Sequence, residues 1–177
     1  MKLQTNNYKL QTNSGLTLIE LLLYVAISSV LLLVISFFLF TLLQSRIKNQ
    51  TIAEVEQQGL QVVQVITQTA RNATGINTPG DGTSGSSLSL GVIAGVNDPS
   101  VFDSSGGVIR IKEGAGSAVA LTNSRVSVSS LTFQNLSRNN TLGTIRVQFT
   151  LTHINSAGRN EYSFSKTFTG SATLRQP

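Results

Sequence analysis

The longest apolar run of the chain lies near its N-terminus, between Leu16 and Leu43. Glu20 is the only charged residue in this run. A helix rises about 1.5 Å per residue and the hydrocarbon core of a bilayer is about 30 Å thick, so a helix of this length can span a membrane. The apolar part of an ordinary secretory signal takes only about 7 to 15 residues. We therefore expect a membrane-spanning helix over residues 16–43.

The helical pattern continues beyond this run as an apolar stripe. Its members recur mostly three or four positions apart among Gln, Glu and Lys residues, and they are Ile47, Ile52, Val55, Gly59, Val62, Ile66 and Ala70. No proline occurs before Pro79, and Asn72 to Gly75 supplies stop signals. We therefore predict one continuous helix, whose amphipathic second part, residues 44–75, packs against a sheet.

After a Gly- and Ser-rich stretch, the period changes from helical to alternating. The alternating segments are Leu88 to Leu90, Val108 to Ile111, Ala118 to Leu121, Val126 to Phe133, Ile145 to Ile154 and Tyr162 to Phe168. The last two form a hairpin through a turn at residues 156–159. Residues 76–177 are thus expected to form a β-rich head with one antiparallel sheet of about four to six strands. The predicted fold class is α+β, with a long N-terminal helix packed on this sheet.

Composition argues against several classes of chemistry. The 177 residues include no cysteine, which excludes disulfides, thiol nucleophiles and thiolate metal sites. The net charge is +5, but Lys2 and Lys9 precede the apolar run and the arginines are scattered, so no concentrated basic block is present. The single histidine, His153, lies in an alternating segment, and we interpret it as a solvent-facing or packed strand residue. We expect no enzyme activity.

Acidic and glycine residues of the head fit turn chemistry. Asp81, Asp98 and Asp103 lie among Gly, Ser and Asn residues, but their spacing matches no EF-hand loop, so we interpret them as loop residues. Gly80, Gly82 and Gly85 are not spaced as a phosphate-binding loop. We expect neither a metal ion nor a cofactor.

The residues that start the apolar run form a recognisable cluster, Ser14-Gly15-Leu16-Thr17-Leu18-Ile19-Glu20. Here the sequence resembles the type IV pilin family, which includes minor pilins and the pseudopilins of type II secretion. The resemblance implies a cytoplasmic leader over residues 1–15, cleavage by a prepilin peptidase between Gly15 and Leu16, and N-methylation of Leu16. Glu20 then takes the fifth position of the mature chain. Leu16 stands where the family commonly has phenylalanine, and Phe37 where it often has proline.

Physical chemistry gives these residues consistent roles. A glycine at position 15 leaves the backbone accessible to a protease and resists helix continuation. Glu20, near the helix start, can reach the headgroup level of a bilayer, but in a dry filament core its carboxylate would need a partner. The resemblance implies that this partner is the free amine of Leu16 in a neighbouring subunit.

Together these features predict a structural subunit, and we expect a minor one. The amphipathic segment from Glu54 to Leu60, which leads to residues 69–73 and precedes a strand-rich head, looks most like that of W-type minor pilins and J-type minor pseudopilins. Partners implied by the resemblance are prepilin peptidase, other pilin or pseudopilin subunits, the inner-membrane assembly platform and membrane lipid. The chain would reside in the bacterial cytoplasmic membrane, head outside, before entering a cell-surface pilus or periplasmic pseudopilus. Two alternatives remain: a pilin-type binding module that captures DNA or a surface ligand, and an uncleaved single-pass surface protein.

Overall fold

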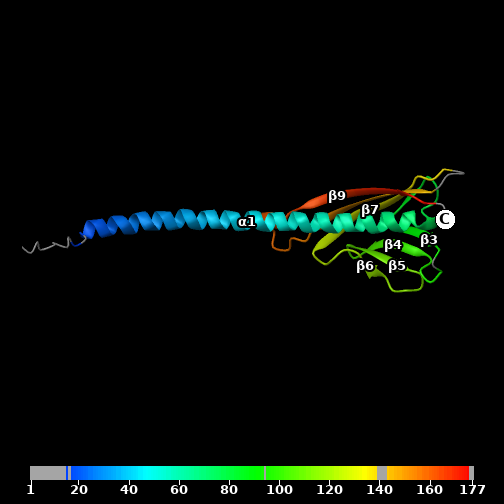
Figure 1. Ribbon diagram of the computed structural model, residues 1–177, viewed down its shortest axis with the longest axis horizontal. Helices are drawn as coiled ribbons and strands as arrows, with labels where there is room; N and C mark the ends of the chain where they lie inside the picture. The colour runs from blue at the N-terminus through cyan, green and yellow to red at the C-terminus, as the bar shows by residue number, and fades with distance from the viewer. Residues whose placement is uncertain (1–14, 16, 94, 139–142, 176–177) are drawn as a thin grey trace, which may run out of the picture. The chain divides into compact units, whose positions relative to one another are not determined.

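The computed structural model describes residues 15, 17–93, 95–138 and 143–175 (Figure 1). By its internal contacts the chain divides into an N-terminal unit, Met1–Leu43, and a head unit, Gln44–Pro177. Helix α1 (Leu18–Arg71) contributes residues to both units. The fold is α+β, as the sequence predicts, because α1 is followed by antiparallel strands on which its second part packs.

Within the N-terminal unit, the described residues from Leu18 to Leu43 form apolar helix. Every residue from Thr17 to Leu43 is exposed, and the helix is long and apolar enough to cross a membrane. Three hydroxyl groups in this segment donate to carbonyl oxygens of their own helix: Ser29 to Ala26 (2.8 Å), Ser36 to Leu32 (2.8 Å) and Thr41 to Phe37 (3.0 Å). These hydroxyls need no hydrogen-bonding partner from outside the helix, which suits an apolar environment.

The head unit contains two antiparallel sheets built from short strands. The five-stranded sheet has the order β1-β3-β4-β5-β6 and the four-stranded sheet the order β2-β7-β8-β9. The strands of the first are β1 (Ala73–Thr78), β3 (Leu88–Val92), β4 (Ser100–Ser105), β5 (Val108–Glu113) and β6 (Val119–Ala120). Those of the second are β2 (Ser84–Gly85), β7 (Val126–Asn135), β8 (Thr144–His153) and β9 (Ser165–Thr173), with the 3-10 helix η1 (Asn160–Tyr162) before β9.

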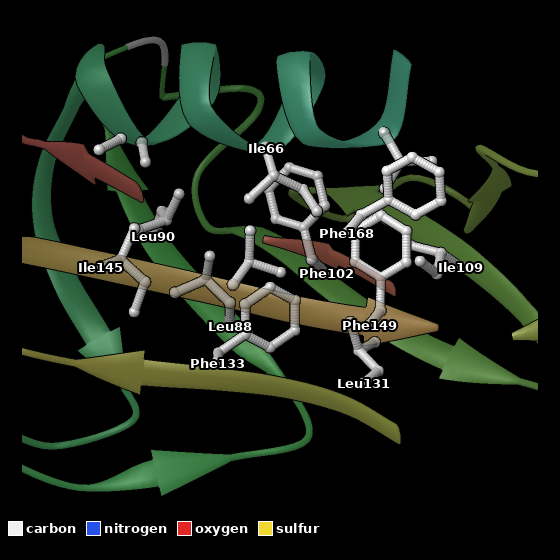
Figure 2. Close-up of a cluster of buried hydrophobic side chains, with 14 of the residues drawn as sticks. Ile66, Leu88, Leu90, Phe102, Ile109, Leu131, Phe133, Ile145, Phe149 and Phe168 are labelled. Carbon is white, nitrogen blue, oxygen red and sulfur yellow. The ribbon is translucent and has the colours of Figure 1, made fainter. Parts of the chain in front are cut away.

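A single apolar core lies between the second part of α1 and the strands (Figure 2). The helix contributes one buried stripe with steps of three and four residues: Thr51, Val55, Gly59, Val62, Ile66 and Ala70. The predicted stripe is therefore confirmed from Val55 onward, while Ile47 and Ile52 are only half-buried. The strands contribute alternating residues, of which Phe102, Phe133 and Phe149 are the largest fully buried side chains.

Glycines allow the helix to approach the last hairpin closely. A Cβ atom at Gly59 would overlap the ring of Phe168, and one at Gly170 of β9 would lie 2.6 Å from a methyl carbon of Val63. Phe168 in turn stacks on Phe149, with ring centroids 5.6 Å apart (Figure 2). The fit between α1 and β9 thus depends on two positions that lack a side chain.

The head differs from the sequence prediction in the number of its sheets. Where one sheet of four to six strands was predicted, the described residues form two sheets. Strands β1, β2 and β4 were not predicted, because their segments are short and rich in Gly, Ser, Thr and Asn. They become strands through pairing: β4 pairs with β5 along its full length, from Ser100 opposite Glu113 to Ser105 opposite Val108. The predicted last strand also begins too early, since Tyr162 belongs to η1.

Candidate assembly site at the start of α1

Thr17 caps the N-terminus of α1. Its carbonyl oxygen accepts a hydrogen bond from the amide of Leu21 (3.1 Å), and its hydroxyl oxygen accepts one from the amide of Glu20 (3.3 Å). Thr17 and Glu20 have the spacing of a capping box, in which Thr at the cap satisfies the amide of the third helical residue. The backbone amide of Glu20 is thus satisfied by the cap, while the assembly role of its carboxylate stays a prediction.

The carboxylate of Glu20 has no counter-ion among the described residues. The hydroxyl of Tyr24, one turn later, donates a long hydrogen bond of 3.5 Å to its Oε1 atom. Among the described residues, no Lys, Arg or His nitrogen lies within ion-pair distance of it. Its position in the first turn is favourable, because the N-terminal end of a helix carries a partial positive charge. An exposed cation of another molecule would thus meet an uncompensated carboxylate.

The predicted processing residues are only partly visible. Gly15 is exposed, and a Cβ atom added there would meet nothing within 4 Å. Leu16 and leader residues 1–14 lie outside the described residues. Cleavage between Gly15 and Leu16, N-methylation of Leu16 and the pairing of its amine with Glu20 therefore stay predictions.

The surroundings of Glu20 are suited to lipid or to other apolar helices. Leu18 and Ile19 beside it expose 79% and 75% of their surfaces, and further along the same apolar segment Phe37 exposes 72%. Exposed apolar area of this extent is unfavourable in water, by about 25 cal/mol for each Å². This apolar surface can be buried in a bilayer or against copies of the same helix. In either case Glu20 is a charged group at one fixed height along the helix.

The remaining candidate residues belong to packing interactions of the head. The ring of His153 stacks on Tyr162 with centroids 5.7 Å apart, and its Nε2 atom lies 3.8 Å from Oε2 of Glu54. Its side chain is only 10% exposed. His153 is thus the packed strand residue that the sequence allowed.

The three aspartates lie in separate interactions. Asp81 accepts from the side-chain amide of Asn135 (3.2 Å), and Asp98 accepts from the backbone amide of Val92 (3.1 Å). Asp103 is not a loop residue as predicted but lies in β4, where it accepts two hydrogen bonds of 2.9 Å from Arg110 of β5. These bonds raise the pKa of the Arg110 guanidinium. Within the described ranges, no three His, Asp or Glu side chains are grouped to hold a metal ion.

Sequence reasoning missed Thr17 and Tyr24. The signal for the first was present, because Thr-x-x-Glu directly before an apolar run is the sequence pattern of a capping box. The signal for the second was the spacing of four residues between Glu20 and Tyr24, which places the two side chains on one helix face.

Comparison of the chain with protein-family models, with curated proteins and with solved structures found no match.

Proposed function

We propose that the chain is a minor subunit of a type IV pilus or of a type II secretion pseudopilus. One observation carries the proposal. A single helix has an exposed apolar segment whose starting carboxylate, Glu20, pairs with no cation among the described residues, and its next segment packs into a β-rich head. The first segment suits burial in lipid or in a helical filament core, and the second fixes the head to it. The segment from Gly15 to Glu20 resembles a prepilin processing site, which supports the same proposal.

In this proposal, processing and assembly are linked through charge. A prepilin peptidase cleaves after Gly15 and creates a free, then methylated, amine at Leu16. When the apolar helix leaves the bilayer for the filament core, Glu20 pairs with the amine of a neighbouring subunit. Leaving a buried ion pair without one partner costs about 3 to 5 kcal/mol, so this pairing favours one axial register over its neighbours.

The proposal also assigns a location and partners. Before assembly the chain is anchored in the bacterial cytoplasmic membrane by residues 16–43, with the leader in the cytoplasm and the head outside. It meets prepilin peptidase, the inner-membrane assembly platform and other pilin or pseudopilin subunits. The final structure is a cell-surface pilus or a periplasmic pseudopilus.

Mass spectrometry of the mature N-terminus tests the processing step. The full chain is produced in cells with an active prepilin peptidase, and in parallel with a peptidase whose catalytic aspartates are replaced. We expect a chain that begins at methylated Leu16 only in the first case, and a Gly15→Val variant that retains its leader. A chain that keeps Met1 in the presence of the active peptidase would contradict the proposal and favour the uncleaved surface protein.

Substitution of Glu20 tests the assembly step. We expect Glu20→Gln to be inserted and cleaved normally but to be incorporated into sheared filaments at least tenfold less than the unmodified chain. Glu113→Gln is the matched control, because Glu113 is an exposed acidic residue of the head in β5. Equal incorporation of both variants would remove the pairing role of Glu20.

A further inference from the structure

Strand β9 forms an edge of the four-stranded sheet. It pairs with β8 from Ser165 opposite Thr152 to Thr173 opposite Thr144, and no strand among the described residues pairs with its other side. Free edges of this length are unusual, because they offer unpaired backbone groups to any extended chain. Native proteins commonly shorten or cover such an edge.

The free backbone groups of β9 can be assigned from the register. The amide of His153 donates to the carbonyl of Phe164 (2.9 Å), and the amide of Leu174 donates to the carbonyl of Gly143 (2.8 Å). Because hydrogen-bonded pairs alternate in an antiparallel ladder, the even-numbered residues of β9 bond to β8. The odd-numbered residues direct their N–H and C=O groups away from β8, and all five are exposed: Ser165, Thr167, Thr169, Ser171 and Thr173.

The second part of α1 runs alongside β9 and packs on the face of that strand that carries Phe168 and Gly170 (Figure 1). At one end Glu56 of the helix binds Lys166 (2.5 Å), and further along Val63 contacts Gly170. Leu60 lies between Glu56 and Val63 on the same helix flank, as the steps of four and three residues require. Leu60 is nevertheless 63% exposed, so this flank has apolar surface that the head does not cover.

The other end of the edge is positively charged. The amide of Arg175 donates to the carbonyl of Arg71 (3.1 Å), which ends the free edge at the last residue of α1. The two arginines line a shallow pocket of about 310 Å³ together with Ser171, Ala172 and Thr173. Among the described residues, no carboxylate lies within ion-pair distance of either guanidinium.

Outward strand groups, the exposed helix flank with Leu60 and the cationic pocket thus all belong to β9 or to segments that contact it. We propose that this surface binds an extended acidic segment of a partner protein as an added strand. The segment hydrogen-bonds to the odd-numbered residues of β9, places an apolar side chain on Leu60 and directs a carboxylate to Arg71 and Arg175. Main-chain hydrogen bonds supply affinity in this mode, and side-chain pockets supply specificity. The inference does not depend on the proposed role in a pilus.

Nucleic acid would use only part of this surface. Phosphates would bind the arginines, but they have no groups that alternate as donor and acceptor at the spacing of a strand. The regular set of five odd-numbered residues therefore favours a peptide.

A peptide-binding measurement on the full chain in detergent micelles tests the proposal. The probe is a fluorescein-labelled nonapeptide of alternating threonine and valine that ends in two glutamates. Its controls are the same peptide ending in two lysines, and two versions N-methylated at alternate amides in opposite phases. We expect saturable binding by fluorescence anisotropy, at least tenfold weaker binding of the lysine version, and loss of binding for only one of the two N-methylated versions.

Two variants of the chain locate the binding site. Thr169→Pro removes an outward N–H but no bond to β8, and Thr169→Ala is its matched control because it keeps that N–H. We expect Thr169→Pro to abolish binding, Thr169→Ala to leave it within twofold, and Arg175→Gln to weaken it about tenfold. Circular dichroism verifies that each variant is folded. If Thr169→Pro is unfolded, the two N-methylated peptides still decide the question.

Several results would overturn the proposal. Equal effects of the two N-methylation phases would show that backbone pairing is not used. Equal binding of the glutamate and lysine peptides would remove the role of the arginines. Absence of peptide binding would also overturn it.

Two other results would assign the surface to a different partner. Salt-sensitive binding of duplex DNA in place of the peptide would assign it to nucleic acid. Self-association of the chain that is lost in Thr169→Pro would assign the edge to a second copy of the chain.

Discussion

The two parts of helix α1 share one backbone element and differ in where their apolar side chains are placed. From Leu18 to Leu43 every residue is exposed, whereas from Thr51 to Ala70 a single stripe is buried against the strands. Among the described residues of its own unit, nothing packs against the first part. The second part packs against strands that fit it closely, down to the glycines at positions 59 and 170. A helix can therefore be stabilised by its surroundings in one segment and by its own protein in the next.

This difference has an energetic consequence. Removing a buried side chain leaves a cavity in a close-packed core, while removing an exposed one leaves the packing of the core unchanged. Substitutions in the second part of α1 should therefore affect stability of the head. Substitutions in the first part should have little effect on unfolding of the head, and under the proposed function they should act on membrane insertion and assembly instead.

The largest effect is expected for a matched pair of isoleucines in α1. Ile66 is fully buried and Ile35 is 52% exposed. Ile66→Ala should lower the free energy of unfolding of the head by about 2 to 5 kcal/mol, because a cavity replaces the lost side chain. Ile35→Ala should change it by less than about 0.5 kcal/mol. Denaturant unfolding followed by circular dichroism at the β-sheet signal measures both, and equal losses would contradict the comparison.

The next largest effect is expected at the close contact between α1 and β9. Gly59→Leu should lower the free energy of unfolding by about 1 to 3 kcal/mol, because the new side chain must displace the ring of Phe168. Gln57→Leu places the same side chain on an exposed position of the helix and should be close to neutral. Thermal unfolding of both variants measures the difference. A neutral Gly59→Leu would show that the helix can move away from β9 at little cost.

A smaller effect is expected where the second part of α1 begins. The ammonium of Lys48 donates to the carbonyls of Ser163 (2.6 Å) and Asn160 (3.4 Å), which fastens the β8–β9 connection to the helix. Lys48→Met should cost about 0.5 to 1.5 kcal/mol and should increase hydrogen exchange at residues 160–163. Arg46→Met is the control, because Arg46 is exposed. Unchanged exchange in Lys48→Met would mean that other contacts hold this connection.

The smallest effect is expected from pH in the same connection. The backbone amide of Glu161 and then the guanidinium of Arg159 lower the pKa of the Glu161 carboxyl below its ordinary value of 4.5. A lowered pKa in the folded state contributes stability above pH 4.5, and this contribution is lost as the pH falls through the folded pKa. The melting temperature of Glu161→Gln should therefore fall less than that of the unmodified chain between about pH 6 and pH 3. Parallel curves would contradict this assignment.

The sequence determined those features that depend on local periodicity. The length and apolarity of the first part of α1, the stripe from Val55 to Ala70 and the alternation of β8 can be read from spacing alone, because side chains repeat every 3.6 residues in a helix and every two in a strand. The capping pair of Thr17 and Glu20 also has a local sequence pattern, although it was not predicted. The α+β fold class followed from the order of these segments.

The tertiary structure decided what depends on contacts between distant segments. Polar segments such as Ser100–Ser105 form strands only because a partner strand supplies their hydrogen bonds, and nothing in their own sequence requires it. The fit of Gly59 to Phe168, the pairing of Asp103 with Arg110, and the free edge of β9 next to Arg71 and Arg175 arise in the same way. Local sequence sets which conformations are favourable, whereas the distances between remote residues are fixed only when the chain packs.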